Sequence, residues 1–447
     1  MSLYNKIGIP AFAILLGWVC LTSTKTNAQG LGNSPYSSLG MGEFYGDGFS
    51  DNTGMGQSGV STGNGFQINN LNPALWVRNK FTTLDIGIIG QYKDIASGTS
   101  RQQNAGGNLA YVAISFPVSP KWTLGVSLKP YSFVDYENSQ TRSIPGATSQ
   151  PIFNSTGGIL GYTSPDAIYY NSGKGGINKA SVTNAFQIGK YLSLGLESSY
   201  YFGNVRKASE VLIPLDFSSN YLVGLSERTT YSDFAFRAGA ALRVPIKKDN
   251  KLFLNLGGTY SIKTDLAARQ TSVFELSQNS FVIPGASDTL INDIKGSLTL
   301  PSQYQVGMSL EWPFKLVVSA DYSNQSWSEY RGFNKSNDGL KNVGRVHLGV
   351  EYLPKFSSLR YFELVRYRVG FSHGKTPYTI DNRDVNDTNV SLGLTLPMGR
   401  GYQNFISVAF VGGQRGAVGS GMVRERYGRV VLGITLLDRW FVKQKID

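Results

Sequence analysis

The sequence predicts an all-β protein, a fourteen-stranded antiparallel transmembrane β-barrel with an N-terminal plug in its lumen. Three observations support this prediction. Glycine supplies 52 of the 447 residues and aromatic residues 12%, whereas only 16% are charged, so neither a disordered chain nor a coiled coil is expected. Apolar side chains alternate with small or polar ones in many segments. The connections between these segments are alternately long and short, as in bacterial outer-membrane barrels.

Residues 1–28 have the features of a signal peptide. Lys6 makes the N-terminal region positively charged, and residues 7–21 form an apolar stretch that is short for a membrane span. Residues 26–28 have small side chains, as at a signal-peptide cleavage site. The single cysteine, Cys20, lies in this segment, so the mature chain would have no disulfide and no thiolate metal site. No later run of ~18 apolar residues suggests a transmembrane helix. An exported chain of this kind resides in the periplasm or in the outer membrane.

Residues 80–447 carry the strand pattern. Within residues 345–352, Val346, Leu348 and Val350 alternate with small or polar residues. A soluble β-sandwich also alternates, but it has no reason to alternate its loop lengths, which favours the barrel. With an even number of strands, both chain termini lie on the periplasmic side. The candidate strands lie near residues 81–92, 105–118, 121–135, 178–189, 191–204, 229–246, 251–266, 297–312, 314–331, 343–354, 364–374, 387–397, 402–413 and 424–440.

Residues 29–79, before the first candidate strand, show no regular alternation of apolar and polar side chains. They are rich in glycine, serine and asparagine, and they are either a loose periplasmic tail or a plug inside the barrel. The segment carries too much aromatic surface to leave in water, so we expect a plug that contacts charged residues of the barrel wall. The aromatic residues are Tyr36, Phe44, Tyr45, Phe49 and Phe66.

Two glycine-rich matches in this segment do not indicate an enzyme. Gly54-x-Gly56-x-x-Gly59 fits a dinucleotide fingerprint, but no strand precedes it and no helix is expected after it. Residues 59–63 fit a nucleophile elbow, which needs a strand-to-helix turn and a histidine partner; neither His347 nor His373 is placed for that role. We therefore expect no catalytic residue, no metal site and no cofactor.

The order of several short motifs resembles the long-chain fatty acid transporter family, the FadL-like barrels. A glycine-rich start at residues 54–59 is followed by Asn72-Pro73-Ala74, similar to that family's hatch, and residues 300–304 are similar to its later strands. The resemblance covers essentially the whole mature chain. It implies fourteen strands, a lumenal hatch at residues 29–79 and transport of hydrophobic compounds. The C-terminus departs from the family, because the chain does not end in an aromatic residue.

Charged residues on the polar face of the strands form the candidate site. If the apolar stripe faces lipid, these side chains point into the lumen, where buried charges must pair or stay hydrated. They either form an ion-paired network that holds the plug, or they anchor a ligand carboxylate at the end of an apolar pocket. The candidate residues are Arg237, Arg345, His347, Glu351, Arg366 and Arg368.

Pro130 interrupts the third candidate strand. It has no amide hydrogen, so the hydrogen-bond ladder needs a bulge or a gap there. The proline either lies at the outer end of the strand, above the bilayer, or opens a window in the wall. The resemblance favours the window, because fatty acid transporters interrupt their third strand and release ligand sideways.

Two functions remain. The first is an outer-membrane channel for passive uptake of hydrophobic small molecules, such as fatty acids or hydrocarbons, with capture by outer loops, an apolar lumen pocket, and release sideways or past the hatch. The alternative is a barrel that serves protein secretion or surface attachment, since some FadL-like barrels, the PorV-like ones, act in type IX secretion with partner proteins. The apolar connection at residues 136–177 favours the hydrophobic ligand. Outer-membrane lipid and lipopolysaccharide are expected neighbours, whereas the net charge of +12 is too dispersed to indicate nucleic acid.

Overall fold

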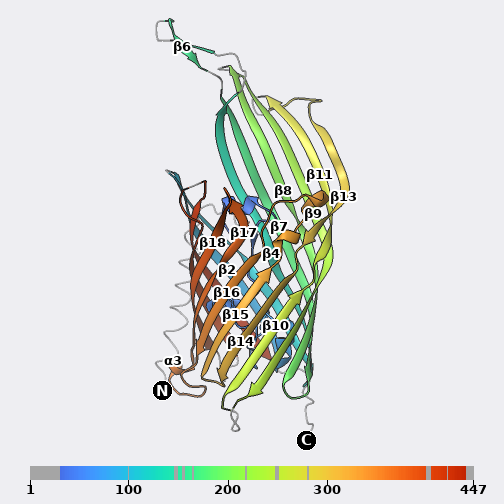
Figure 1. Cartoon of the computed structure of the whole chain (residues 1–447), viewed down its shortest axis with the longest axis vertical. Helices are drawn as coiled ribbons and strands as arrows, with labels where there is room; N and C mark the ends of the chain where they lie inside the picture. Colours follow the sequence, from blue (N-terminus) through green and yellow to red (C-terminus); the bar gives the residue numbers. More distant parts are fainter. Residues whose placement is uncertain are drawn as a thin grey trace, which may run out of the picture.

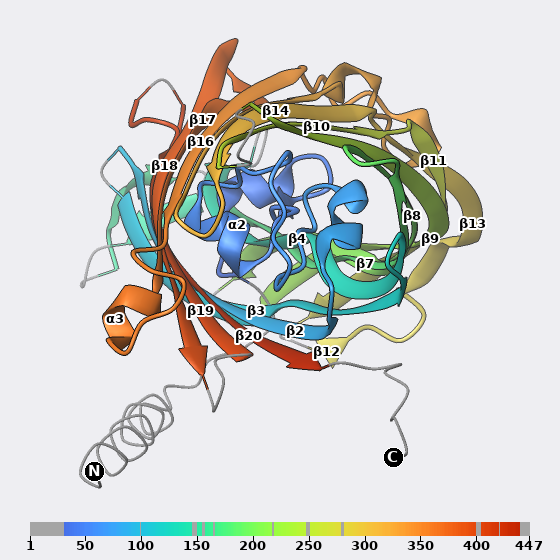
Figure 2. The same ribbon diagram turned by 90° about the horizontal axis from the view of Figure 1, so that it is seen from below.

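The strands of the chain close into one barrel (Figures 1 and 2). The computed structural model describes residues 31–438, apart from residues 99, 145–149, 154–156, 164–165, 217–218, 247–250, 279–280, 399–403 and 420, so the expected signal peptide lies outside the described residues. The first barrel strand pairs antiparallel with the last, with Thr82 opposite Asp438. The predicted fourteen-stranded antiparallel barrel is confirmed. No helix in the described part is long and apolar enough to cross a membrane.

Twelve barrel strands are continuous, and two consist of two segments each. The two divided strands are β10 (Phe253–Ser261) with β11 (Thr264–Gln278), and β13 (Asp288–Leu300) with β14 (Gln303–Trp312). The continuous strands are β2 (Thr82–Ser97), β3 (Ser100–Ser119), β4 (Trp122–Ser143), β7 (Asp166–Ile188), β8 (Leu192–Asp216), β9 (Ser219–Pro245), β15 (Leu316–Gln325), β16 (Val343–Tyr352), β17 (Arg366–Ile380), β18 (Arg383–Met398), β19 (Asn404–Arg415) and β20 (Arg424–Asp438).

Short elements complete the fold. The hairpin of β5 (Gln150–Phe153) and β6 (Ile159–Thr163) and the short strand β12 (Phe281–Val282) lie above the barrel, at the end with the long connections. The turns η3 (Trp327–Glu329) and η4 (Phe333–Lys335) follow β15, and the single-turn helix α3 (Tyr361–Leu364) precedes β17.

Side chains along each strand point alternately to the outer face of the barrel and to the lumen. On β16, Val346, Leu348 and Val350 are 39–45% exposed on the outer face, whereas His347 is 6% exposed on the inner face. Successive residues of a strand point to opposite faces, so one apolar stripe on each strand builds a continuous apolar belt around the barrel. The short connections lie at the end of the barrel that contains Thr82 and Asp438, which is therefore the periplasmic end.

Several expected loops are continuations of strands, which corrects the sequence-based boundaries. The β4–β7 pairing extends to Ser143 opposite Asp166, and the β8–β9 pairing extends to Asp216 opposite Ser219. One side of the barrel consequently rises well above the other (Figure 1). Above the membrane neither face of a strand is uniformly apolar, so the period of two that marks a strand in the sequence fades while the backbone pairing continues.

A plug formed by residues 31–79 occupies the lumen, as Figure 2 shows in blue. It contains η1 (Pro35–Ser38), the short strand β1 (Glu43–Phe44), the helical turn α2 (Ser50–Gly54) and η2 (Pro73–Arg78). Its large side chains are buried, with Tyr36, Phe49 and Trp76 each 1% exposed. Burial of this aromatic surface is the main favourable contribution to keeping the segment in the lumen.

Candidate functional site

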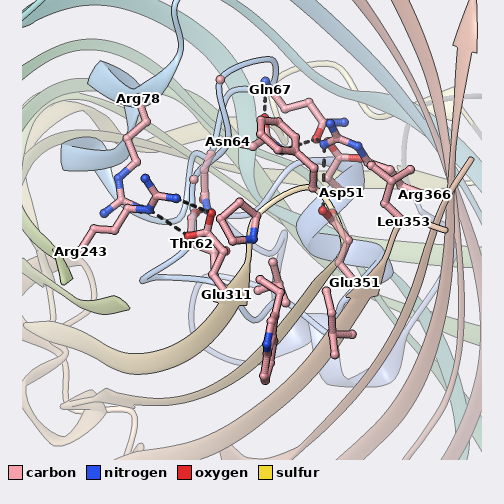
Figure 3. A pocket seen from close by; sticks show the side chains of 18 of the residues that line it. Asp51, Thr62, Asn64, Gln67, Arg78, Arg243, Glu311, Glu351, Leu353 and Arg366 are labelled. Carbon is pink, nitrogen blue, oxygen red and sulfur yellow. Dashed lines mark hydrogen bonds and ion pairs between the residues drawn. The ribbon is translucent and has the colours of Figure 1, made fainter. Parts of the chain in front are cut away.

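Alternate residues of β17 attach the plug to the wall. Arg368 donates hydrogen bonds to Glu351 of β16 and to Asp51 of α2, each at 2.7 Å. Arg366, two residues earlier on the same inward face, donates to Gln67 of the plug at 3.0 Å. Figure 3 shows Asp51, Gln67, Glu351 and Arg366 together at one side of a cavity. Each arginine is nearly fully buried, so it depends on these partners.

A second cluster of charges lies between β8, β9 and the plug. Arg237 of β9 forms a buried ion pair with Glu197 of β8, and it lies 3.4 Å from Asp47 of the plug. Lys179 pairs with Glu197 at 2.6 Å, and Lys129 lies 3.7 Å from Asp47. Burial alone would raise the pKa of Asp47, but the three cations Lys179, Arg237 and Lys129 hold it below its usual value. Asp47 therefore stays ionised and the plug stays attached on this side as well.

Arg345 and His347 differ in what they contact. His347 makes hydrogen bonds through Nδ1 to the carbonyl oxygen of Gly56 in the plug, at 2.9 Å, and through Nε2 to Ser323, at 3.1 Å. Arg345 donates to Asp387 of the neighbouring wall at 3.0 Å. The structure thus places all six candidate residues on the lumen side. Arg237, His347, Arg366 and Arg368 contact the plug, whereas Arg345 and Glu351 pair within the wall.

The hatch motif forms a tight turn against the wall. The Asn72 side chain accepts a hydrogen bond from the backbone amide of Ala74 at 2.9 Å and so caps η2, which begins at Pro73. Its amide nitrogen donates to Ala240 of β9 at 3.0 Å. A Cβ atom at Gly239 would lie 2.2 Å from Asn72 Oδ1. Glycine is therefore required in the wall because the plug backbone approaches it closely.

Sequence reasoning missed a third buried cluster, which holds the outer part of the plug. Glu43 of β1 forms ion pairs with Lys93 of β2 and Arg415 of β19, and Arg415 also lies 3.4 Å from Glu425 of β20. Although burial raises the pKa of Glu43, Lys93 and Arg415 lower it to about 2. The alternation of side chains along β2, β19 and β20 could have assigned three of these residues to the lumen: Lys93, Arg415 and Glu425. Glu43 lies in the plug, where no period exists.

The wall has a gap in its hydrogen-bond ladder next to Pro130. Pairing between β3 and β4 ends at Val112 opposite Leu128, and the β4–β7 register shifts between Pro130 and Ser132. Beyond this point the free edge of β4 pairs with β1 of the plug, where Phe44 lies opposite Ser132. The ladder with β3 thus ends just before Pro130, the ladder with β7 has a bulge just after it, and β1 of the plug takes the place of β3.

The gap adjoins a group of aromatic side chains. The ring of Tyr131 lies 5.5 Å from Phe44 and 4.9 Å from Tyr201, and Phe44 lies 4.9 Å from Trp327. Phe44 and Tyr131 also line a cavity of about 260 Å³, whose wall includes Arg237. The cavity beside the gap therefore combines aromatic surface with charged groups, and is less uniformly apolar than the sequence suggested.

A second cavity, of about 490 Å³, opens near the periplasmic end (Figure 3). On one side Arg243 donates to Glu311 at 2.8 Å, and on the other lie Arg366 and Glu351. Pro313 and Leu353 contribute apolar surface between them. Within the described residues, no group of three or more histidine, cysteine, aspartate or glutamate side chains could hold a metal ion.

Comparisons with known proteins agree with this architecture. The model of the BamG family matches residues 12–447. Similar solved structures include a Pseudomonas aeruginosa FadL homologue (13% identity, TM-score 0.53, covering 89% of this chain and 98% of the other) and the CymD monoaromatic hydrocarbon channel (12%, 0.51, 89% and 99%). The Ralstonia pickettii toluene transporter TbuX is 16% identical, with a TM-score of 0.50 and coverage of 88% and 99%. No curated protein matches the sequence. The fold that this chain shares with these structures is that of the FadL-like barrels.

Proposed function

The chain belongs to the BamG family, and we propose that it is a plugged outer-membrane channel that passes small hydrophobic molecules through the gap between β3 and β4. The observation that carries this proposal is the edge of β4 above Pro130, which pairs with β1 of the plug instead of with β3. A two-residue strand is the smallest part of the plug that has to move to expose this edge. The fold is shared with channels described as carrying monoaromatic hydrocarbons and toluene, which supports this class of ligand.

The aromatic rings beside the gap supply a path for such molecules. Phe44, Tyr131 and Tyr201 form edge-to-face contacts, which offer apolar surface of the size of one ring. Pro130 lies opposite Asn178 of β7, which lies opposite Phe202 of β8, so the gap is at the upper edge of the apolar belt. A hydrophobic molecule that leaves through it enters the outer leaflet from above, and its transfer into the hydrocarbon is favourable. In this mechanism the outer loops capture the molecule, the aromatic group holds it, and displacement of β1 releases it sideways.

Release past the hatch would require more rearrangement. The inner part of the plug is attached on two sides of the lumen, to β9 through Arg237 and to the neighbouring strands β16 and β17 through His347, Arg366 and Arg368. Breaking a buried ion pair by removing one partner costs about 3–5 kcal/mol. Displacing β1 breaks one group of buried ion pairs, those of Glu43 with Lys93 and Arg415. Release past the hatch breaks the attachments of Asp47, Asp51 and Gly56 together, so we favour the lateral route. The same attachments keep the lumen closed to water and polar solutes.

A disulfide across the gap tests the lateral route. Phe44 and Ser132 lie directly opposite each other in the β1–β4 ladder, a spacing that suits a cystine bridge. In the variant Phe44→Cys with Ser132→Cys, oxidised cells should lose uptake of radiolabelled toluene, and a reductant should restore it. A matched bridge between the lipid-facing pair Val318 and Val350 on β15 and β16 should have no effect. Unchanged uptake in the oxidised gap variant would contradict the proposal.

A role in protein secretion or surface attachment is the second candidate, and one observation favours it. The β8–β9 hairpin extends far above the membrane, and a small-molecule channel has no need of such a tall sheet. Replacing residues 208–226 with Asn-Gly would join the paired residues Lys207 and Glu227 through a short turn. The channel function predicts unchanged toluene uptake in this variant. The second function predicts loss of proteins from the cell surface.

A further inference from the structure

Three cations stand in one row across the outer face of the tall sheet. Lys174 of β7 lies opposite Arg206 of β8, which lies opposite Arg228 of β9, and all three are exposed. Like charges directly opposite each other destabilise a sheet. Arg206 donates to Ser226 at 2.9 Å, and Asp135 ends the row opposite Lys174. In the part of the chain that the structure describes, none of the three cations forms an ion pair. Asp135 offsets the charge of Lys174, but Arg206 and Arg228 have no carboxylate beside them in the row, which ends at Thr271 of β11, so the row keeps a net positive charge.

The row lies just above the apolar belt. On β8 the outward residues from Leu192 to Phe202 are mostly aliphatic or aromatic, and these ten steps along a tilted strand span about 25 Å, the height of the lipid-facing band. Tyr200, Phe202 and Phe234 form the aromatic girdle at its upper edge, with ring centroids 4.9 and 6.0 Å apart. Arg206 is four residues further, about 10 Å higher. This is the level of the phosphate groups of the outer leaflet.

A concavity of about 690 Å³ continues upward from the row on the same face. Its lower edge carries Arg206 and Arg228, and four residues higher Gly224 lies between Glu210 and Glu275 in one row across the three strands. Arginine recognises phosphate through paired hydrogen bonds, whereas carboxylates accept hydrogen bonds from hydroxyl and amide groups. The two rows are four residues apart, about 13 Å along the strand. A phosphoglycerol headgroup is too short to reach both, and a phosphorylated disaccharide is long enough.

We infer that this face binds the phosphorylated disaccharide headgroup of an outer-leaflet glycolipid of the lipid A type. The phosphate lies against Arg206 and Arg228, with Lys174 beside it, and the sugar hydroxyl groups face Glu210 and Glu275. The acyl chains then run down the apolar belt below Phe202. The bound lipid supplies the negative charge that the row lacks, and it fixes the height of the barrel in the membrane on its tall side.

The test measures binding of three lipids to the purified full-length barrel in detergent: lipid A, enzymatically dephosphorylated lipid A, and phosphatidylglycerol. The variant Arg206→Gln with Arg228→Gln should bind lipid A at least tenfold more weakly than the unchanged protein. Arg269→Gln is the matched control, because Arg269 is exposed on neighbouring β11 but already pairs with Asp293 at 2.6 Å. It should bind lipid A normally. Dephosphorylated lipid A should bind weakly to every form.

Three outcomes would overturn the inference. The double variant could bind lipid A as tightly as the unchanged protein, phosphatidylglycerol could bind as tightly as lipid A, or the control could lose affinity equally. Folding is checked by heat-modifiable migration on gels, and Lys174→Gln provides a milder variant with a smaller loss of affinity. Without lipid, the double variant should melt at the same or a higher temperature, since it removes a like-charge contact. A purely structural role of the arginines predicts a lower melting temperature.

Discussion

Replacing Arg368 with methionine should release α2 of the plug while the wall stays intact. The Arg368 side chain is 1% exposed and is shared between Asp51 and Glu351. Methionine has a similar length without the charge, so both carboxylates lose their shared cation. Losing one member of a buried ion pair costs about 3–5 kcal/mol. Glu351 retains Arg366 at 4.0 Å, so we expect the lower value, about 3 kcal/mol, which corresponds to about a hundredfold more frequent opening of α2.

Hydrogen exchange measures this opening directly. The amide of Thr53, which donates to Phe49 at 2.9 Å within α2, should exchange about a hundredfold faster in Arg368→Met, while amides of β17 stay protected. The matched control is Arg269→Met. Its ion pair with Asp293 is more than half exposed on both sides, and such surface pairs contribute about 1 kcal/mol or less. Equal exchange of Thr53 in both variants would refute the view that Arg368 holds the plug.

The remaining predictions concern four other contacts. Gly239→Val should destabilise the docking of η2 by about 1–3 kcal/mol, because the added side chain overpacks the contact. Hydrogen exchange of the η2 amides measures the effect. Gly428→Val is the control, because Gly428 has open space around it. Asn72→Ala removes the cap of η2 and should cost about 1 kcal/mol by the same measurement. The contribution of Glu43 to the stability of plug docking should be fully present above pH about 4.5 and should be lost as the pH falls towards about 2. Hydrogen-exchange protection of the β1 amides, measured across this pH range, monitors the loss. Pro130→Val restores an amide donor, so pairing of β4 should improve and toluene uptake should fall several-fold; undiminished uptake would count against the gap as the exit.

The strands and their lumen faces could be predicted because the period of two is a local signal. His347 and Arg368 were assigned to the lumen from their immediate neighbours alone, and the interruption at Pro130 follows from the chemistry of one residue. The tall side of the barrel was not predicted, because strands in water have no uniformly apolar face. The turn between β17 and β18 was also placed in a long loop. Its residues Asp381 and Asn382 have φ angles of +48° and +60°, and this residue pair is a signal for a tight hairpin.

The contacts of the plug could not be read from the sequence. Glu43 meets Lys93 across 50 positions and Arg415 across 372 positions, and nothing local links them. That β1 would pair with the open edge of β4 also depends on the complete barrel, since the edge exists only where β3 turns away. Asn72 is an example. The sequence identifies the motif that contains it, but its hydrogen bond to Ala240 forms only when β9 of the wall lies beside it.

The way the plug divides its contacts imposes an order on assembly. η2 packs on β4, β7, β8 and β9, which come early in the chain, whereas α2 packs on β17, β18, β19 and β20, which come last. The seam closes only when β2 pairs with β20. We therefore expect the plug to dock on the early strands while the sheet is still open. The late strands then wrap around it, and their arginines meet its carboxylates only as the seam closes. In this order of assembly the docked plug provides the surface on which the last strands, β17 to β20, pack.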